Sequence, residues 1–320
     1  MQNKVPKVDA SSYEPAVWEA ARHLEWCPPG HGDLYAALAG KDESGESMLD
    51  KLLAEGKKIM FVSNSDNLGA TLDLDLMTYF MESDKPFLME VAERTENDKK
   101  GGHLAKRKSD GRLILRESAQ CAKEDEADFQ DVSKHRYFNT NNLWVRLDKL
   151  KEAMDAAGGF IDLPMIKNSK TVDPQSDASP PVFQLETAMG AAIECFDGAD
   201  AIVVTRKRFA PVKKCNDLLL LRSDVYTIAD NFTLQLSEGV EKVPVVDLDK
   251  KHFKLVSQLD EATSGGVPSL SKCERLTVKG PVTFAAGVSF VGKVEVVNNS
   301  DTPGLLASGE YKDGIFAVEH

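Results

Sequence analysis

Residues 46–80 combine apolar residues at helical spacing with a short apolar run. Ser47 can cap a helix that ends at Gly56, and the apolar run 59–62 then predicts a buried strand. A polar turn follows at 63–69, and Thr71 is placed to cap a second helix. Because helix, buried strand, polar turn and helix in this order are typical of a parallel sheet covered by helices, the pattern predicts an α/β fold.

Similar signals continue through the middle of the chain. A helix is predicted from Asp148 to Gly158, and apolar residues at spacings of three and four predict an amphipathic helix over 184–196, closed by Gly198. The segment 173–181 is rich in Pro, Ser and Asp, which is typical of a surface loop. Four further apolar runs predict strands: 87–91, 112–115, 142–145 and 201–204.

The last fifty residues have a different pattern. From Pro268 the helical period disappears, and short β-rich pieces recur between Gly280, Gly287 and Gly292. A spacing of about six or seven residues between turns resembles the coils of a parallel β-helix. We therefore predict two domains, residues 1–267 and 268–320. Because a short stack of coils has open ends, the second domain is a candidate for homo-oligomer contacts.

Charge and cysteine content narrow the function classes. Among 320 residues, 39 Lys and Arg face 51 Asp and Glu, a net charge of -12, which disfavours non-specific binding to nucleic acid or anionic membranes. The five cysteines stand singly, which argues for a reducing compartment and against finger-type zinc sites. No apolar run is long enough to cross a bilayer, and the N-terminus lacks a signal-peptide core, so we expect a cytoplasmic protein.

Two candidate sites lie in the first seventy residues. Gly30 and Gly32 flank His31, so the backbone can approach a ligand closely and the imidazole adds a donor; a tight turn is the alternative interpretation. Asn64 and Asp66 follow the predicted strand 59–62, where ligands of open α/β sheets bind and a carboxylate can hold a divalent cation. Here the alternative is a polar cap or turn.

Two more candidates lie downstream. The run 206–214 holds five cations, and Pro211 stiffens the approach to Lys213, which favours a directed ammonium; a solvated charged face is the alternative. The Asn-rich stretch 138–144, with Asn141, offers neutral amides that suit sugar hydroxyls; an Asn-rich turn is the alternative. Together the four candidates fit a nucleotide sugar bound with a metal ion.

These motifs, in this order, resemble UTP-glucose-1-phosphate uridylyltransferases (UDP-glucose pyrophosphorylases) of the type related to eukaryotic enzymes. The resemblance covers nearly the whole chain. It implies a nucleotidyltransferase-like, Rossmann-type mixed α/β sheet with a small C-terminal parallel β-helix. The motifs that carry it are PPGHGD at 28–33, SNSDNLGA at 63–70, FNTNNLW at 138–144, QLETA at 184–188 and RFAPVK at 208–213.

By resemblance, Gln2 and Gly30 bind the uridine nucleotide, and three polar side chains contact the glucosyl phosphate or sugar: His31, Asn64 and Asn141. The family's substrates and products are UTP, glucose 1-phosphate, UDP-glucose and pyrophosphate. In the implied reaction, an oxygen of glucose 1-phosphate attacks the α-phosphorus of UTP. Catalysis then consists mainly of alignment and charge neutralisation.

The resemblance gives catalytic roles to two residues: Asp66 holds Mg²⁺, and Lys213 meets the phosphates. The chain departs from the family in one respect, since the family's Gly-rich loop has no counterpart before Gln2. We therefore expect a C-terminal portion of such an enzyme, with weak or no activity alone. Two alternatives are a non-catalytic module for nucleotide-sugar binding or assembly, and a UDP-N-acetylhexosamine pyrophosphorylase.

Overall fold

The structure is a computed structural model that describes residues 2–94, 99 and 101–318. Its contacts divide the chain into two compact units. The first unit consists of Met1–Asn64 and Leu72–Arg206, and the second of Ser65–Thr71 and Lys207–His320. In the described ranges, each helix is too short or too polar to cross a bilayer.

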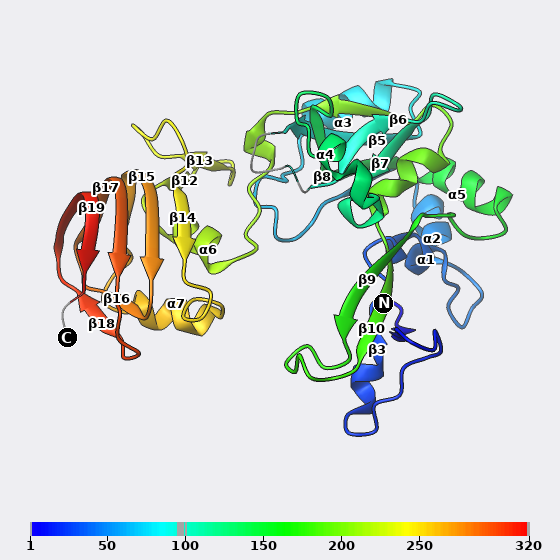
Figure 1. The fold of residues 1–320 in the computed structure, drawn as a ribbon. Coiled ribbons are helices and arrows are strands. Elements are labelled where there is room, and N and C mark those ends of the chain that lie inside the picture. The colour runs from blue at the N-terminus through cyan, green and yellow to red at the C-terminus, as the bar shows by residue number, and fades with distance from the viewer. Residues whose placement is uncertain (1, 95–98, 100, 319–320) are drawn as a thin grey trace. The chain divides into compact units, whose positions relative to one another are not determined.

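A six-stranded mixed sheet forms the centre of the first unit (Figure 1). The pairing of β11 with β5 is parallel, and the other pairs are antiparallel. The expectation of a parallel unit around 59–62 is therefore wrong, because β4 pairs antiparallel with β8. The strands are β4 (Ile59–Val62), β5 (Phe87–Glu93), β6 (His103–Lys106), β7 (Leu113–Arg116), β8 (Tyr137–Arg146) and β11 (Asp200–Val203).

Both faces of this sheet are covered. Phe87 and Met89 belong to one core cluster, whereas Leu88 packs with Phe80 and Trp144 in another, as the alternation of side chains along a strand requires. The covering helices are α1 (Asp33–Ala39), α2 (Met48–Ala54), α3 (Leu74–Glu82), α4 (Glu126–Phe129) and α5 (Leu147–Ala156).

The predicted helix starts are confirmed in part. Ser47 caps α2 through a reciprocal capping box with Asp50, as its position suggested. Asp73, not Thr71, caps α3, because its carboxylate accepts from the amides of the first turn. Asp148 lies inside the first turn of α5, and Arg146 is the N-cap residue.

The predicted amphipathic helix over 184–196 is wrong. The segment begins within strand β10 (Pro181–Thr187), which pairs with β9 (Met165–Thr171), and continues as the 3₁₀ helix η5 (Met189–Cys195). Residues Met189 to Ile193 are buried on every side, so this segment has no exposed face to support an amphipathic helix. Strand pairing has overridden a local helical period.

Small sheets near the N-terminus complete the first unit. Strand β1 (Val5–Pro6) pairs with β3 (Trp26–Cys27), and β2 (Val8–Asp9) adds to β10. Between them the buried ammonium of Lys7 donates to the Val172 carbonyl at 2.7 Å. Short 3₁₀ turns also occur: η1 (Arg22–Glu25), η3 (Ser118–Gln120) and η4 (Lys123–Asp125).

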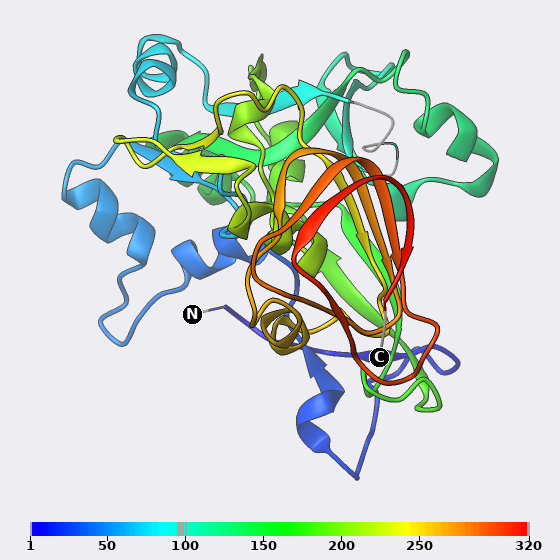
Figure 2. The ribbon, with the colours of Figure 1, turned by 90° about the vertical axis from the view of Figure 1, so that its left-hand side faces the viewer.

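The second unit consists mainly of parallel strands, with one antiparallel pair, β12 with β13. The order β14-β15-β17-β19 forms one parallel sheet, and β16 pairs in parallel with β18. Figure 1 shows β14, β15, β17 and β19 side by side, and Figure 2 looks along this stack, with the orange to red segments one behind another. The bounds are β12 (Tyr226–Ile228), β13 (Leu234–Leu236), β14 (Val245–Leu248), β15 (Ser269–Lys279), β16 (Val282–Phe284), β17 (Val288–Val297), β18 (Gly304–Leu306) and β19 (Gly309–Ala317).

The second unit also contains helices α6 (Cys215–Arg222) and α7 (Val256–Ala262), preceded by the turn η6 (Arg206–Arg208). One buried cluster runs from Cys215 to Val318. The predicted division at Val267 does not coincide with the observed one, because residues on both sides of Val267 share this cluster. The loss of helical period there is a change of structure within one unit.

Candidate functional site

The Gly30–His31–Gly32 turn is pinned against Thr187. The Thr187 amide donates to the Pro29 carbonyl, and its carbonyl accepts from the Gly32 amide, each at 2.9 Å. Gly30 has a φ of 84°, and a Cβ there would lie 2.5 Å from the Thr187 carbonyl oxygen. Only glycine permits both the left-handed backbone and this approach, so the turn is a fixed element of the unit.

Two predicted residues are held at this turn. Gln2 donates from Nε2 to the Gly30 carbonyl at 3.1 Å. The Nδ1 atom of His31 accepts from the Met189 amide at 2.9 Å, so the neutral ring carries its hydrogen on Nε2. The exposed imidazole thus has a defined tautomer and a fixed direction.

Asn141 lies at a bulge in β8. The β5–β8 register shifts between Glu90 and Val91, and Asn141 has a φ of 59°. Asn is one of the few residues with a side chain that tolerate this conformation. Two hydrogen bonds tie it to Asn139: the Asn141 amide donates to Oδ1 at 2.8 Å, and Asn139 Nδ2 donates to Asn141 Oδ1 at 2.7 Å. Bulges commonly re-aim a side chain beside a functional site.

Other groups brace the bulge from β5. Thr140 Oγ1 donates to the Glu90 carbonyl at 2.7 Å, and the fully buried Glu90 carboxylate accepts from Asn142 Nδ2 at 3.0 Å and Trp144 Nε1 at 2.9 Å. A buried carboxylate needs such donors, because burial without partners is costly. The bulge is therefore part of a rigid hydrogen-bonded network.

Asn64 and His31 approach the same bulge by different routes. Val62 of β4 pairs with Leu143 of β8, and Asn64 and Asn141 each lie two residues beyond that pair. On the other side, a Cβ on Gly190 would lie 2.7 Å from Asn139 Nδ2, and Gly190 follows the Met189 amide that His31 contacts. The first unit thus gathers the predicted residues Gln2, Gly30, His31, Asn64 and Asn141 around β8, β10 and η5.

Asp66 and Lys213 are brought together in the second unit. The Val212 amide donates to the Asp66 carbonyl at 2.8 Å, so Lys213 follows a residue hydrogen-bonded to Asp66. The Leu68 amide continues the pairing by donating to the Ala210 carbonyl at 3.1 Å. Residues 147 positions apart in sequence therefore share one short antiparallel contact.

Asn67 holds the two segments in place. Its Nδ2 donates to the Arg208 carbonyl at 3.1 Å, and its Oδ1 accepts from the Gly69 amide at 3.1 Å and the Ala210 amide at 2.8 Å. Arg208 in turn donates to the Thr71 carbonyl at 3.0 Å. For Asn67 the turn interpretation is therefore correct: its buried amide is a structural clasp.

Asp66 and Lys213 contrast with these neighbours. Within the described part of the chain, the Asp66 carboxylate and the Lys213 ammonium form no side-chain hydrogen bond or ion pair. Mg²⁺ is usually bound through one or two carboxylates together with substrate phosphates and water, and Asp66 fits that chemistry. No group of three or more His, Cys, Asp or Glu among the described residues could hold a metal by itself.

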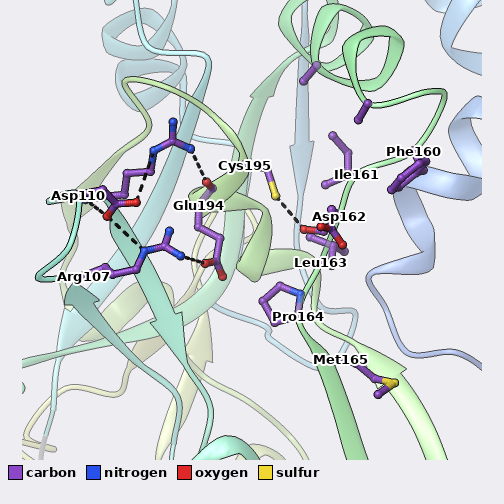
Figure 3. Close-up of a pocket in the computed structure, with 13 residues that line it drawn as sticks. Arg107, Asp110, Phe160, Ile161, Asp162, Leu163, Pro164, Met165, Glu194 and Cys195 are labelled. Carbon is purple, nitrogen blue, oxygen red and sulfur yellow. Dashed lines mark hydrogen bonds and ion pairs between the residues drawn. The ribbon is translucent and has the colours of Figure 1, made fainter.

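A separate cavity of about 780 Å³ lies in the first unit (Figure 3). Arg107 pairs with Asp110 at 3.2 Å and Glu194 at 3.3 Å, while Cys195 donates to the Asp162 carbonyl at 3.3 Å. Burial raises the pKa of Cys195 to about 11. Since Arg107 is already paired with carboxylates and none of the predicted site residues lines it, the cavity is poorly suited to a diphosphate.

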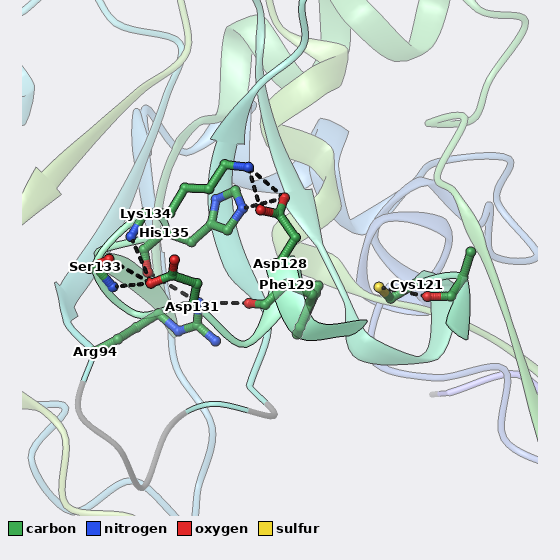
Figure 4. A network of polar contacts seen from close by, with 9 residues as sticks. Arg94, Cys121, Asp128, Phe129, Asp131, Ser133, Lys134 and His135 are labelled. Atoms are coloured by element: carbon green, nitrogen blue, oxygen red, sulfur yellow. Dashed lines mark hydrogen bonds and ion pairs between the residues drawn. The ribbon is translucent and has the colours of Figure 1, made fainter. Parts of the chain in front are cut away.

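A buried aromatic and polar cluster surrounds His103. Its ring stacks on His135 with centroids 4.0 Å apart, and neither ring nitrogen has a hydrogen-bond partner among the described residues. Burial, helped by His135 and nearby arginines, lowers the pKa of His103 to about 3. Figure 4 shows His135 and Lys134 both directed at the Asp128 carboxylate. We therefore expect protonation of His103 at low pH to destabilise this part of the core.

Three residues that hold the site were not singled out as site residues from the sequence: Thr187, Asn139 and Asn67. Asn139 could have been found, because residues two apart on a strand share a face and it precedes Asn141 by two. Thr187 acts through its backbone, and the role of Asn67 depends on contacts with residues more than 140 positions away. The sequence around Thr187 and around Asn67 does not indicate either of these contacts.

Comparisons with known proteins show the family of the chain. A family model described as UTP–glucose-1-phosphate uridylyltransferase matches residues 1–290. The UTP–glucose-1-phosphate uridylyltransferase of Saccharomyces cerevisiae is 39% identical over 298 residues, which cover 92% of this chain and 57% of that protein. The enzyme of the same name from Pyrus pyrifolia is 38% identical, with 93% of this chain and 60% of the relative covered. The chain thus spans less than two thirds of these relatives.

Solved structures of UDP-glucose pyrophosphorylases are similar to this chain in sequence and in fold. A mutant UDP-glucose pyrophosphorylase from Leishmania major, in complex with UDP-glucose, is 49% identical with a TM-score of 0.87. The match covers 99% of this chain and 68% of that one. A structure described as UDP-glucose phosphorylase from Trypanosoma brucei is 48% identical with a TM-score of 0.88, covering 100% and 68% respectively.

Proposed function

Because the chain belongs to the UTP–glucose-1-phosphate uridylyltransferase family, we propose that it binds the glucosyl phosphate and phosphate groups in the formation of UDP-glucose and pyrophosphate from UTP and glucose 1-phosphate. One observation carries the proposal. In a chain of net charge -12, a carboxylate and an ammonium stand on hydrogen-bonded segments without a partner from the described chain. Such groups are available to a phosphate and its counter-ion.

In this proposal two side chains, Asp66 and Lys213, balance the charge of the phosphates. Asp66 is the residue that would hold Mg²⁺, and Lys213 places an ammonium on the phosphates. Bound Mg²⁺ would neutralise phosphate oxygens where charge develops. Asn67 keeps the backbones of both segments in register through its three hydrogen bonds, so neither charged group needs a protein partner to be positioned.

The remaining proposed roles concern recognition of the uridine nucleotide and of the glucosyl group. Gln2 and Gly30 would bind the uridine nucleotide, and His31, Asn64 and Asn141 would contact the glucosyl phosphate or sugar. Amide and imidazole groups suit hydroxyls because they bind without the desolvation of a charge. The hydrogen bonds that fix His31 and Asn141 reduce the freedom lost on binding.

The reaction needs alignment and charge neutralisation more than covalent work by the protein. A phosphate oxygen of glucose 1-phosphate forms a bond to the α-phosphorus of UTP, the α–β bridging bond breaks, and pyrophosphate leaves with that electron pair. Because the match leaves over a third of the curated relatives' length uncovered, we expect the 320 residues by themselves to be weakly active or inactive. Binding is therefore the informative measurement.

The test is calorimetry with UDP-glucose at several Mg²⁺ concentrations. Lys213→Met should weaken binding about tenfold, as expected for one charge-assisted contact to phosphate. Asp66→Asn should remove most of the Mg²⁺ dependence. Matched controls in the same unit are Lys242→Met and Asp230→Asn, both at exposed positions. Equal affinity and equal Mg²⁺ dependence in all four variants would contradict the proposal.

The two alternative functions are not proposed. The relatives described above are glucose enzymes, so a hexosamine substrate and a purely non-catalytic module lack support. The calorimetric series should include UDP-N-acetylglucosamine, which we expect to bind more weakly than UDP-glucose. Tighter binding of the hexosamine would reverse this choice.

We also propose a short parallel β-helix in the second unit. In the β15–β17, β16–β18 and β17–β19 pairs, paired residues are separated by 18 to 22 positions, for example Lys279 with Val297 and Val282 with Gly304, which fits coils of three short sides. The open edge of β19 would then be the contact surface of a homo-oligomer. The five free thiols favour a cytoplasmic location.

A further inference from the structure

The Asn139 side chain has the properties of a positioning group. Its amide donates from Nδ2 to Asn141 Oδ1 at 2.7 Å and accepts on Oδ1 from the Asn141 backbone amide at 2.8 Å. The first bond fixes the orientation of the Asn141 side chain, and the second supports its left-handed backbone. Only a side chain with both a donor and an acceptor at this reach can form the pair.

The surroundings keep Asn139 in this orientation. It is half-buried, and Gly190 lies so close that a Cβ there would be 2.7 Å from Asn139 Nδ2. The next residue, Thr140, is tied to the Glu90 carbonyl at 2.7 Å. The bulge is therefore held from β5 and from η5, and the Asn141 side chain is aimed before any ligand binds.

We propose that Asn139 is a positioning residue that directs the Asn141 amide toward the hydroxyls of the bound hexose. The inference rests on the proposed function for its ligand, a hexose joined to a nucleoside diphosphate. It does not require Asn139 to touch that ligand. A purely structural role would instead stabilise the bulge without affecting sugar recognition.

The decisive variant is Asn139→Asp. Aspartate has the same shape and still accepts from the Asn141 amide, so the bulge is retained, but it cannot donate to Asn141 Oδ1 and repels it. We expect UDP-glucose to bind roughly three- to tenfold more weakly by calorimetry, with the affinity for UDP unchanged. Asn168→Asp in β9 is the matched control and should change neither affinity.

A double-mutant cycle separates positioning from an independent effect. Asn141→Gly keeps the left-handed backbone and removes the side chain that Asn139 directs. In that background, Asn139→Asp should cause no further loss of UDP-glucose affinity. Additive losses, an unchanged affinity in the single variant, or equal losses for UDP and UDP-glucose would each overturn the proposal.

A second measurement keeps the inference separate from the proposed function. If the wild-type chain does not bind UDP-glucose, the proposed function fails, and the positioning role is then judged from the χ1 couplings of Asn141 by NMR. We expect one rotamer in the wild type and averaging in Asn139→Asp. A single, unchanged rotamer in both proteins would overturn the positioning role whatever the ligand.

Discussion

The two units hold their candidate site residues in opposite ways. In the first unit, His31 and Asn141 are each fixed by hydrogen bonds to neighbouring groups. In the second unit, the adjacent Asn67 carries the hydrogen bonds, while the side chains of Asp66 and Lys213 have no partner in the described chain. The side chains of the first set are fixed by hydrogen bonds, whereas in the second set only the backbone is fixed and the charged side chains are not.

The difference follows from what each set would bind. A hydroxyl is recognised by direction, so a neutral amide or imidazole works best when its orientation is fixed in advance. A phosphate or metal ion is recognised by charge, and a protein counter-ion would have to be displaced before binding. Charged groups therefore gain from an ordered backbone and an unpaired side chain.

The largest expected effect breaks the pinned turn of the first unit. Gly30→Ala places a Cβ against the Thr187 carbonyl at a φ of 84°, and we expect the first unit to lose about 3 kcal/mol of unfolding free energy. Urea unfolding followed by tryptophan fluorescence measures this, because all three tryptophans belong to that unit: Trp18, Trp26 and Trp144.

Gly45→Ala is the matched control for this substitution. Gly45 has a nearly equal φ of 82° but open space around the added Cβ, so only the backbone cost of about 1 kcal/mol remains. Similar losses in the two variants would show that the contact with Thr187 is unimportant.

The next effect tests the clasp in the second unit. Asn67→Ala removes three hydrogen bonds and leaves buried backbone groups unsatisfied, so we expect a loss of about 2 to 3 kcal/mol. Asp66→Ala, one residue away, should change stability by less than about 0.5 kcal/mol. Hydrogen exchange of the β15 and β17 amides reports on this unit. A larger effect for Asp66 than for Asn67 would reverse the assignment of their roles.

The third predicted effect on stability is acid sensitivity of the first unit. The pKa of His103 is lowered to about 3 when folded, against about 6.5 when unfolded, so the unfolded chain binds more protons between these values. Stability should therefore fall as the pH decreases through that window, by about 2 kcal/mol between pH 7 and pH 5. Tryptophan-monitored urea unfolding at both pH values measures the loss.

His103→Phe is the control for the pH effect. The ring would keep its packing beside Phe129 and His135, and no hydrogen bond to the described chain would be lost. Most of the pH dependence should disappear with little change at pH 7. An unchanged slope would show that other groups, such as His135, dominate the acid response.

The parts of the fold that depend on local sequence were predictable. The capping box of α2 and the strand β4 follow from a cap residue, a helical period and a short apolar run that lie next to one another. The order of the motifs also sufficed to indicate the family. In contrast, nothing local distinguishes the strand and 3₁₀ turn at 181–195 from an amphipathic helix, because long-range pairing and burial decide between them.

For the candidate site too, some features could be predicted from the local sequence and others could not. The sequence by itself determined the residue types: glycines around a histidine, an aspartate after a strand, amides in a cluster and a lysine after a proline. Only the tertiary structure decided that Asn67 joins two distant segments and that Asn139 orients Asn141. It also decided that the side chains of Asp66 and Lys213 have no partner in the described chain, although their backbones are hydrogen-bonded. The physical reason is that composition sets which bonds a side chain can form, whereas contacts between distant segments decide which of them are already made.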